Sequence, residues 1–306
     1  MVQQLLLSLL KAGGIAALAI GVFYLLYREI IKLGIFPKLT QRQAFALLCL
    51  LALLVFVIAI TAMREGGVPE KAPGQAETPP RESDLVAWWS GDTADAQGDR
   101  IRGTIVGQVT YTNGIGGRAF GFDGSGYIQA SADLLPAGSD DRSIELWLMP
   151  TSLPNGPNDQ ETLFSYGAFA SPNQEYRIFY SPSEFGIAMT NWGHSVGAAG
   201  QLALNQWHQV VVSSYAGHTS FFLDGQQTGM ADLTIATPRA SVLYIGGTSP
   251  ENIERGKQTP PSVSVVSFHG RIQDVRIYGV ALTSENVRAL FNQVKRKHPE
   301  AFPVQN

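Results

Sequence analysis

A tryptophan in a short polar loop has the surroundings that best suit ligand chemistry. Trp192 lies in the segment NWGHSVG, with Asn191 before it and His194 two residues after it. An exposed indole ring can stack on the apolar face of a sugar while neighbouring amide and imidazole groups orient its hydroxyls. We therefore predict a ligand-binding loop at Asn191, Trp192 and His194. The alternative is a loop tryptophan that folds back onto the protein and only fills volume.

The histidines and the lone cysteine form no recognisable catalytic or zinc-binding pattern. The five histidines include no pair at i, i+4, and Cys49 lies inside an apolar run. Zinc sites need closely spaced ligands, and a nucleophilic serine needs a strained turn beside a base. We therefore predict no catalytic residues and no enzyme activity. His208, which follows Trp207, is expected to pack and to make one hydrogen bond.

The N-terminal region has the character of a membrane anchor. Residues 44–63 contain no charge, and residues 5–27 form a second apolar stretch interrupted by Lys11 and Gly13-Gly14. About 20 apolar residues in a helix span the hydrocarbon of a bilayer. We predict a transmembrane hairpin over residues 1–63 with helices at about 5–27 and 44–63. A signal peptide is the alternative, but the start MVQQ carries no basic residue.

The charge distribution orients this predicted hairpin in the bilayer. The loop at residues 28–43 carries four Lys or Arg, which places it on the cytoplasmic side and both termini outside the cytoplasm. Residues 64–84 contain four prolines and form a Pro/Glu-rich linker, expected to be extended and solvated. The remainder of the chain is mildly acidic, which argues against nucleic acid as a partner. We predict a cell-membrane protein whose body faces the periplasm or the exterior.

Residues 85–293 read as an all-β body. Short runs rich in β-branched and aromatic residues alternate with Gly, Pro, Asn and Asp clusters, as in the strands expected at 85–89, 126–131, 143–150, 175–181, 184–190, 207–215, 219–225, 241–247 and 271–279. Within 143–150, Ile144, Leu146 and Leu148 fall on one face, and Glu145, Trp147 and Met149 fall on the other. The alternation predicts half-buried strands, and the length suits a two-sheet antiparallel sandwich or jelly roll.

Turns and one helix complete the predicted body. Asp224-Gly225 suits a type I′ hairpin turn, and Asp123-Gly124 is expected to play a similar part. The segment SENVRALFNQ predicts a helix capped by Thr283 or Ser284, with Val287, Leu290 and Phe291 packed on the sandwich. Residues 294–306 form a basic tail, expected to be a solvated helix end. The long loop at 249–264 is either a recognition surface or a disordered tip.

Five landmarks in the body appear in the order of a known family. They are LVAWWSGD at 85–92, GIGGRAFGFDGSGYIQA at 114–130, SIELWLMPTSLP at 143–154, LNQWHQVVVSSYAGHTSFFLDGQQTG at 204–229, and LYIGG with FHGRIQDVRIYGVALTSENVRALF at 243–247 and 268–291. With them, residues 85–293 resemble the laminin-G-like domain of the concanavalin A-like lectin and glucanase superfamily. The membrane hairpin and the linker lie outside the resemblance. The resemblance implies a sandwich that more often serves binding or adhesion than catalysis, with glycan or protein ligands.

The resemblance also allows two tests on acidic residues. Glucanases of this superfamily carry Glu-x-Asp-x-x-Glu on one strand, whereas this sequence offers Glu145 alone, which we interpret as structural. Many lectin-like sandwiches bind Ca²⁺, and Asp92 and Asp274 are candidate ligands because first and last strands of a jelly roll are commonly neighbours. Relatives often carry a further acid after Phe-Asp-Gly and an Asp-Glu pair in the closing strand, where this chain has Gly126 and Gln273-Asp274.

Three functions follow from the sequence. The first is a membrane-anchored recognition module that binds carbohydrate or cell-envelope glycan without catalysis, through a concave face or the Trp192 loop. The second is a protein-interaction or scaffolding subunit of a membrane complex. The third is a degraded hydrolase, for which Glu145 would be the residue to test.

Overall fold

The computed structural model describes residues 78–97, 101–154, 159–182, 186–198, 200–258 and 264–302. The predicted membrane helices at 5–27 and 44–63, their connecting loop and residues 64–77 of the predicted linker lie outside these residues. Among the described residues, no helix combines the length and the apolar character that crossing a membrane requires.

The body is built from strands that the sequence analysis located in large part. The strands are β1 (Leu85–Trp89), β2 (Gly103–Val106), β3 (Val109–Asn113), β4 (Arg118–Asp123), β5 (Tyr127–Ser131), β6 (Arg142–Pro150), β7 (Asp159–Gly167), β8 (Glu175–Ser181), β9 (Gly186–Thr190), β10 (Ser195–Ala198), β11 (His208–Tyr215), β12 (His218–Leu223), β13 (Gln226–Asp232), β14 (Val242–Ile245), β15 (Ser264–Ser267) and β16 (His269–Tyr278). Two α-helices, α3 (Pro250–Gln258) and α4 (Ser284–Lys297), and two short 3-10 turns, η2 (Glu82–Asp84) and η3 (Pro299–Ala301), accompany them.

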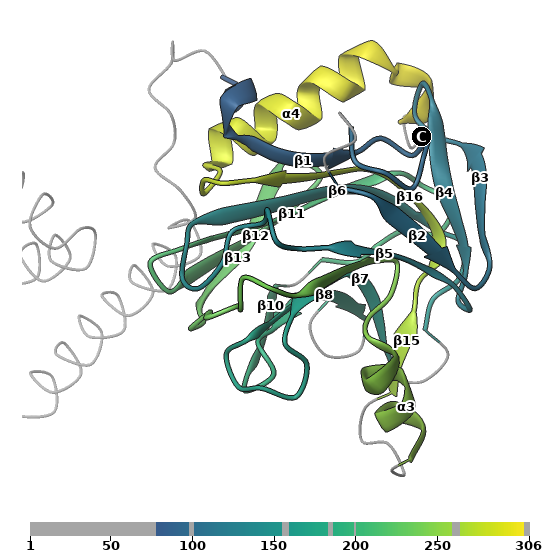
Figure 1. Cartoon of the computed structure of the whole chain (residues 1–306). Coiled ribbons are helices and arrows are strands. Elements are labelled where there is room, and N and C mark those ends of the chain that lie inside the picture. Colours follow the sequence, from purple (N-terminus) through teal and green to yellow (C-terminus); the bar gives the residue numbers. More distant parts are fainter. Residues whose placement is uncertain are drawn as a thin grey trace, which may run out of the picture. The chain divides into compact units, whose positions relative to one another are not determined.

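The strands form two largely antiparallel sheets that pack face to face, as predicted (Figure 1). We call them sheet A, with order β13-β12-β11-β6-β16-β4-β3 and β1 also paired to β16, and sheet B, with order β10-β9-β8-β7-β14-β5-β2 and β15 also paired to β7. The first strand, β1, and the last, β16, are antiparallel neighbours. The first and last strands are therefore neighbours, as was expected when Asp92 and Asp274 were chosen as candidate ligands.

The core lies between the two sheets and follows the period-two alternation of the strands. Ile144, Leu146 and Leu148 of β6 point inward from sheet A, and Tyr176, Ile178 and Tyr180 of β8 point inward from sheet B, all in one buried cluster. Burial of such side chains stabilises the folded state by about 25 cal/mol for each Å² of apolar surface taken from water. The inward residues therefore hold the sandwich together, and the outward residues are left for other roles.

Figure 1 shows α4 over the outer face of sheet A and α3 at one edge of sheet B, beside β15. Helix α4 begins at the N-cap Thr283, as predicted, because the Thr283 hydroxyl accepts a hydrogen bond from the Asn286 backbone N–H at 3.3 Å. Val287 packs with Val211 and Phe222 of the outer face of sheet A. The prediction that β6 is half buried is therefore wrong, because α4 covers the second face and leaves Glu145 and Trp147 fully buried.

Two predicted turns differ in what they connect. Asp224 and Gly225 both have positive φ, at 51° and 77°, and join the antiparallel strands β12 and β13, which confirms the hairpin. Asp123-Gly124 instead lies between β4 of sheet A and β5 of sheet B. The Asp123 carboxylate accepts from the Ser125 backbone N–H at 2.9 Å and orders this crossing. The second turn is therefore no hairpin, because the chain changes sheets there.

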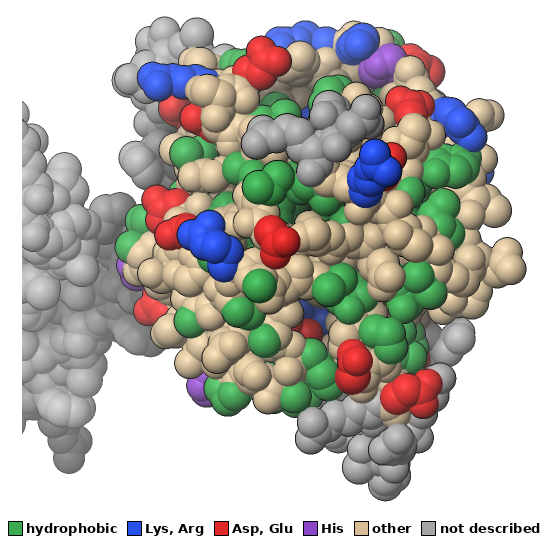
Figure 2. Space-filling view, in the orientation of Figure 1, with side chains coloured by type: hydrophobic (Ala, Val, Ile, Leu, Met, Phe, Trp, Pro, Cys, Tyr) green, Lys and Arg blue, Asp and Glu red, His purple; other side chains and the backbone are tan. Residues whose placement is uncertain are grey.

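Segments at the two ends of the body are more ordered than predicted. Residues 78–84, assigned to the solvated linker, include η2, and the Thr78 carbonyl accepts a hydrogen bond from Asn286 at 2.8 Å. The basic residues Lys295 to Lys297 do form the last turn of α4, and Figure 2 shows lysine and arginine side chains over this helix. Beyond them, the ring of Phe302 meets the ring of Trp147 edge-on, with centroids 5.6 Å apart. The start of the predicted tail therefore packs on the outer face of sheet A.

Candidate functional site

The outer face of sheet B carries a row of polar side chains that crosses seven strands. Register pairs each residue with the next, and together we call them the polar row: Thr104, Gln129, Tyr244, Ser165, Arg177, Thr190 and Ser195. Neighbouring strands lie about 4.8 Å apart, so the row extends about 30 Å. Because alternate residues of a strand share a face, the same strands direct hydrophobic side chains into the core.

One half of the row, over β2, β5 and β14, is open to solvent. Thr104 is exposed and Gln129 is half buried, and both line a groove of about 520 Å³. Its other lining residues are Arg102, Ala130, Ser131, Asp133, Ala240, Ser241 and Val242. The Ser241 hydroxyl is buried at the groove wall without a hydrogen-bond partner among the described residues. The groove therefore offers hydroxyl, amide, guanidinium and carboxylate groups to a polar ligand.

The aromatic member of the row lies between the two halves. Tyr244 is half buried and meets the ring of Tyr127 edge-on, with centroids 5.5 Å apart. Burial raises the pKa of Tyr244 to about 12, with Glu251 and Tyr127 adding to the rise. The phenol therefore stays protonated at neutral pH and is available as a hydrogen-bond donor.

The other half of the row, over β7, β8 and β9, is covered. Arg177 is 4% exposed, and its Nη2 donates to Gln160 Oε1 at 2.8 Å. Its Nε lies 3.5 Å from Glu175 Oε1 in a buried ion pair, and its guanidinium lies over the ring of Phe179. Asn252, on the first turns of α3, donates to Glu175 Oε1 at 3.3 Å. Helix α3 therefore contacts this half of the row through a polar residue.

Buried polar atoms without hydrogen-bond partners are concentrated on this covered half. Of nine such side-chain atoms among the described residues, five lie on the outer face of β7 and β8: Thr162 Oγ1, Glu175 Oε2, Arg177 Nε, Arg177 Nη1 and Ser181 Oγ. Glu161 Oε2 is a sixth on β7, but Glu161 pairs in register with the inward Tyr180. Each unsatisfied buried group costs about 1–3 kcal/mol. Burial raises the pKa of Glu175, with Arg177 opposing the rise, and burial lowers the pKa of Arg177. The charges here are only partly compensated within the described part of the chain.

A buried carboxyl group at one end of β7 adds to this character. Glu161 is 1% exposed, and its Oε1 lies 3.0 Å from Nδ1 of His269, which comes from sheet A. Burial and the nearby Asp159 raise the pKa of Glu161 to about 8. The pair therefore links the two sheets with a carboxyl that is largely protonated at neutral pH.

The predicted Trp192 loop borders the row, but its three residues have different roles. Asn191 is fully buried, and its amide donates to Asn173 Oδ1 at 2.8 Å and to the Thr234 carbonyl at 2.7 Å, while its Oδ1 accepts from the backbone N–H groups of Gly193 and His194. Asn191 therefore orders the loop and is not placed to contact a ligand, which corrects the prediction for this residue.

Trp192 and His194 remain at the surface of the loop. Trp192 is half buried with φ of 75°, and its ring meets Phe169 edge-on at 4.5 Å, as in the alternative of a tryptophan folded onto the protein. His194 is exposed. The backbone N–H of Trp192 donates to the hydroxyl of Thr190, so the loop is tied to the end of the polar row.

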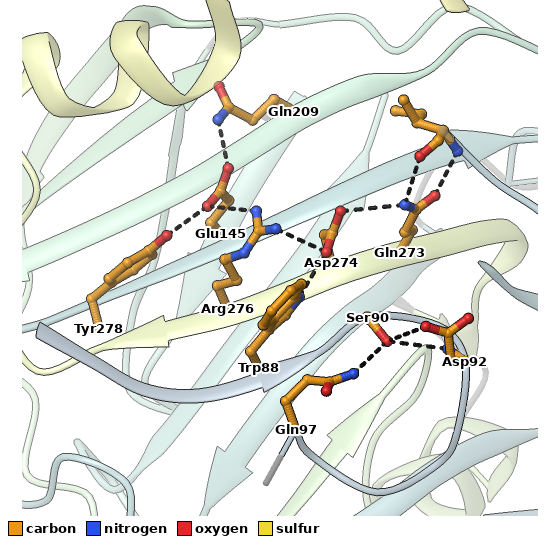
Figure 3. A network of polar contacts seen from close by, with 11 residues as sticks. Trp88, Ser90, Asp92, Gln97, Glu145, Gln209, Gln273, Asp274, Arg276 and Tyr278 are labelled. Atoms are coloured by element: carbon orange, nitrogen blue, oxygen red, sulfur yellow. Dashed lines mark hydrogen bonds and ion pairs between the residues drawn. The ribbon is translucent and has the colours of Figure 1, made fainter. Parts of the chain in front are cut away.

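The predicted calcium ligands are occupied by protein donors. Asp274 Oδ1 accepts from Trp88 Nε1 at 2.6 Å and from Arg276 Nη2 at 2.9 Å, and Asp92 Oδ2 accepts from the Ser90 hydroxyl at 3.0 Å. Figure 3 shows Asp92 joined to Ser90 and Asp274 joined to Trp88, Gln273 and Arg276. No group of three or more His, Cys, Asp or Glu in the described part of the chain is arranged to hold a metal. A guanidinium and an indole N–H at Asp274 do not fit a cation, so the prediction of a shared site is corrected.

Glu145 lies at the centre of a closed network on the outer face of sheet A (Figure 3). Its Oε1 accepts from Gln209 Nε2 at 2.7 Å, and its Oε2 accepts from the Tyr278 hydroxyl at 2.9 Å and lies 3.5 Å from Arg276 Nη1. Arg276 continues the network to Asp274. The geometry agrees with the structural interpretation of Glu145, because both carboxylate oxygens are engaged beneath α4.

The backbone at Asp274 explains how this network is assembled. Asp274 has φ of 52°, and the register of β16 against β6 shifts between Gln273 and Arg276. Such a β-bulge inserts one residue and redirects the side chains beside it.

His208 makes more hydrogen bonds than the one predicted. Its Nδ1 lies 2.8 Å from Asp224 Oδ2, and its Nε2 accepts from the Ala203 N–H.

Sequence reasoning missed the polar row and Arg177. The signal was present in EYRIFYS, where Glu175 and Arg177 alternate with Tyr176, Ile178 and Tyr180. Two charges on one face of a strand that is otherwise aromatic and aliphatic indicate a buried polar surface. The rest of the row comes from strands distant in the sequence, so only the register could reveal it.

Comparisons with known proteins agree with this architecture. A family model described as the concanavalin A-like lectin/glucanases superfamily, Laminin_G_3, matches residues 122–288, just over half of the chain. No curated protein matches the sequence. Domain 4 of AbnA, a GH43 extracellular arabinanase from Geobacillus stearothermophilus, solved with arabinotriose, is similar with a TM-score of 0.50 and 20% identity, over 68% of this chain and 98% of that domain.

Two further solved structures share the fold at lower coverage of their own length. The binding domain of Paraclostridial Mosquitocidal Protein 1 has a TM-score of 0.51 and 12% identity, over 69% of this chain and 52% of that one. A mutant Trypanosoma rangeli sialidase displaying trans-sialidase activity has a TM-score of 0.51 and 15% identity, over 71% of this chain and 34% of that one. Identities this low establish a shared fold alone.

Proposed function

The chain belongs to the concanavalin A-like lectin/glucanase superfamily, and we propose that its sandwich is a non-catalytic recognition module that binds carbohydrate along the polar row of sheet B. The observation that carries the proposal is the concentration of exposed and unpartnered polar groups on that one outer face. The third function predicted from the sequence, a degraded hydrolase, has less support, because Glu145 is enclosed in the network under α4.

The chemistry of the row suits a saccharide. Sugar hydroxyls both donate and accept hydrogen bonds, and the groove offers amide, hydroxyl and charged partners of both kinds through Gln129, Ser131 and Asp133. Tyr244 adds an aromatic ring beside it. The open groove of about 520 Å³ crosses β2, β5 and β14, so a short oligosaccharide is the proposed ligand.

We place this module on a membrane anchor. The apolar stretches at 5–27 and 44–63, with the basic loop at 28–43, support a two-helix hairpin in the cell membrane. The same charge pattern favours a body outside the cytoplasm, facing the periplasm or the exterior. There the polar row would meet cell-envelope glycan, and the lipid bilayer would be a second partner of the chain.

A second function, protein interaction within a membrane complex, is favoured by one other surface. A groove of about 530 Å³ runs beside the start of α4 on the outer face of sheet A. It is lined by the exposed Tyr215 and Met230 together with Phe222 and Leu282. Its exposed apolar side chains suit a protein partner better than a sugar.

Binding to a saccharide panel tests the main proposal. The full chain, purified in a mild detergent, is titrated calorimetrically with neutral and acidic oligosaccharides, arabinotriose among them. Ser131→Trp fills the open groove and should weaken binding at least tenfold, whereas Tyr111→Trp on the edge strand β3 of sheet A should leave it unchanged. Binding that survives Ser131→Trp in full, or no binding to any saccharide, would overturn the proposal.

A further inference from the structure

The open groove over β2, β5 and β14 has sides of different chemistry. Ala240 and Val242, both exposed, line it from the β14 side. Strand β5 lies between β14 and β2 and contributes Gln129 and, just beyond its end, Asp133, while Arg102 lies at the start of β2. The groove is therefore apolar along one side and rich in hydrogen-bonding groups along its floor and its other side.

Two charged side chains of opposite sign line one end of this groove. Arg102 and Asp133 are both exposed, and neither side chain has a hydrogen bond or an ion pair with another described residue. Arg102 directly precedes a residue paired with Ala130, so it lies beside Ser131 on the neighbouring strand. Asp133 is two residues beyond Ser131, and two residues of chain span at most about 7 Å. A ligand at this end of the groove therefore meets both charges.

The two charged groups have complementary hydrogen-bonding capacities. A guanidinium only donates hydrogen bonds, and an ionised carboxylate only accepts them. A hydroxyl does both, so sugar hydroxyls can accept from Arg102 and donate to Asp133. A carboxylate on the ligand has no proton to donate to Asp133, and an ammonium group has no lone pair with which to accept from Arg102. Uncharged hydroxyls are therefore the groups that satisfy both side chains.

The charges around the groove also balance. The lining contains one cation and one anion, and an ionised group between them is attracted by one and repelled by the other within the screening length of about 10 Å at 0.1 M salt. Outside the lining, Arg239 precedes Ala240 and adds a positive charge. Burial and then Glu251 raise the pKa values of Tyr127 and Tyr244, which places a negative charge beside the row. An ionised ligand therefore has no net electrostatic attraction to this surface.

From these contacts we infer that the saccharide is neutral, with free hydroxyls between Arg102 and Asp133 and a C–H face on Ala240 and Val242. The inference rests on the proposed function and specifies the chemical class of its ligand and the way in which the ligand lies. Contact with the β14 side removes apolar C–H surface from water, while the polar groups of β2 and β5 fix the orientation of the hydroxyls.

A matched pair of ligands tests the class of saccharide. The panel that tests the proposed function includes the neutral sugars cellotriose and galactotriose. The neutral sugar that binds most tightly is compared with the same sugar after oxidation of its primary alcohols to carboxylates. The full chain in detergent is titrated with both forms at low and at high salt. We expect the neutral form to bind at least threefold more tightly, with an affinity that is nearly independent of salt.

Variants at exposed positions assign this behaviour to two side chains. Arg102→Gln and Asp133→Asn each keep a hydrogen-bonding group without its charge and should weaken binding of the neutral sugar about tenfold, since hydrogen bonds to charged groups are the stronger ones. Asp133→Lys leaves two cations in the groove and should reverse the preference in favour of the oxidised sugar, with a strong salt dependence. Arg118→Gln on β4 and Glu82→Gln on η2 change exposed charges outside the groove and should alter neither affinity.

The outcomes are distinguishable. Equal or tighter binding of the oxidised sugar, or binding of acidic saccharides alone, would overturn the neutral class while the carbohydrate proposal stands. An unchanged affinity in both Arg102→Gln and Asp133→Asn would overturn the role of these two side chains. Failure to bind any saccharide of the panel would overturn the proposed function and this inference together. Because the comparison of the two sugars uses the unmodified chain, it does not depend on the folding of any variant.

Discussion

The outer faces of the two sheets have similar polar components and opposite degrees of closure. On sheet A, register aligns Val211, Glu145, Arg276 and Trp88 across four strands, and the charged groups find partners in one another. On sheet B, Glu175 and Arg177 form a pair of the same type, but three of their polar atoms have no hydrogen-bond partner among the described residues. Charge burial alone therefore does not distinguish a structural network from a candidate site.

The covering helix explains the difference. Helix α4 is amphipathic and brings Val287 against the apolar part of sheet A, while Phe291 stacks on Trp147 at 5.8 Å with the rings 8° apart. Helix α3 meets sheet B through Asn252 and contributes a hydrogen bond to a group that is already charged. Beneath α4 the charged groups are paired, and Trp147 Nε1 and Gln209 Oε1 are the buried atoms of this face without a partner among the described residues. On sheet B the atoms without a partner include those of the charged residues Glu175 and Arg177.

The largest expected effect is the loss of the sheet A network. Glu145→Ala leaves Arg276 and the Tyr278 hydroxyl without their common acceptor, and removal of one partner from a buried ion pair costs about 3–5 kcal/mol. Urea unfolding followed by tryptophan fluorescence should show this loss. A decrease below about 1 kcal/mol would mean that the face is less closed than its contacts indicate.

The next largest effect concerns the apolar cover itself. Phe291→Ala removes a ring that contacts Trp147, Phe302 and the backbone region of Gly225. Since Phe291 is only partly buried, we expect a loss of about 2–3 kcal/mol, toward the lower end for deletion of an aromatic side chain from a core. Saccharide binding should be unchanged when it is measured well below the melting temperature. A parallel loss of binding would contradict the separation of the two faces.

A smaller, pH-dependent effect is expected near sheet B. The raised pKa of Glu161 means that the folded state holds a proton that the unfolded state releases above its ordinary pKa. The stability contributed by this group is therefore complete at low pH and is lost as the pH rises toward about 8. Asp159, Tyr180 and His269 are the titratable groups around it.

Replacement of this carboxyl by an amide should remove the dependence. Glu161→Gln is expected to be more stable than the unmodified chain by about 2 kcal/mol at pH 8. At pH 5 the two proteins should be nearly equal in stability. Thermal unfolding at the two pH values provides the measurement. Equal melting temperatures at pH 8 would show that His269 compensates the charge.

The smallest change in stability is expected at the buried charge pair of sheet B. The double variant Glu175→Leu, Arg177→Met replaces the incompletely satisfied pair by apolar side chains, a change that is often neutral or stabilising by about 1–4 kcal/mol. We expect stability unchanged or up to about 1 kcal/mol higher. A strong destabilisation would place this pair with Glu145 among structural residues.

Local patterns in the sequence predicted much of the fold. Period-two alternation located β6, β8 and β11, and the Asp224-Gly225 pair located a hairpin, because each signal is contained within a few neighbouring residues. The cap at Thr283 was predicted for the same reason. The family landmarks then indicated the sandwich. Helix α3 was not predicted, since its segment PENIERGKQ lacks an apolar stripe.

The candidate site was predicted only at its border. The sequence pointed to the loop that adjoins Thr190, yet Asn191 proved to be internal, because its amide hydrogen bonds reach Asn173 and Thr234 in other loops. The pairing of Asp92 with Asp274 also failed. The bulge in β16 turns Asp274 toward Arg276 and Trp88, and a one-residue insertion in a strand register is not visible in the sequence alone.

The sequence by itself determined nine of the described strands, the inward side of β6 and the apolar face of α4, since alternation and amphipathicity are local properties of the chain. The tertiary structure decided which outer face is closed and which retains open polar groups. Glu145, Gln209 and Arg276 meet only because three strands distant in the sequence share one register, and Arg177 joins the polar row for the same reason. Register and helix docking therefore separate a structural charge from a candidate ligand contact.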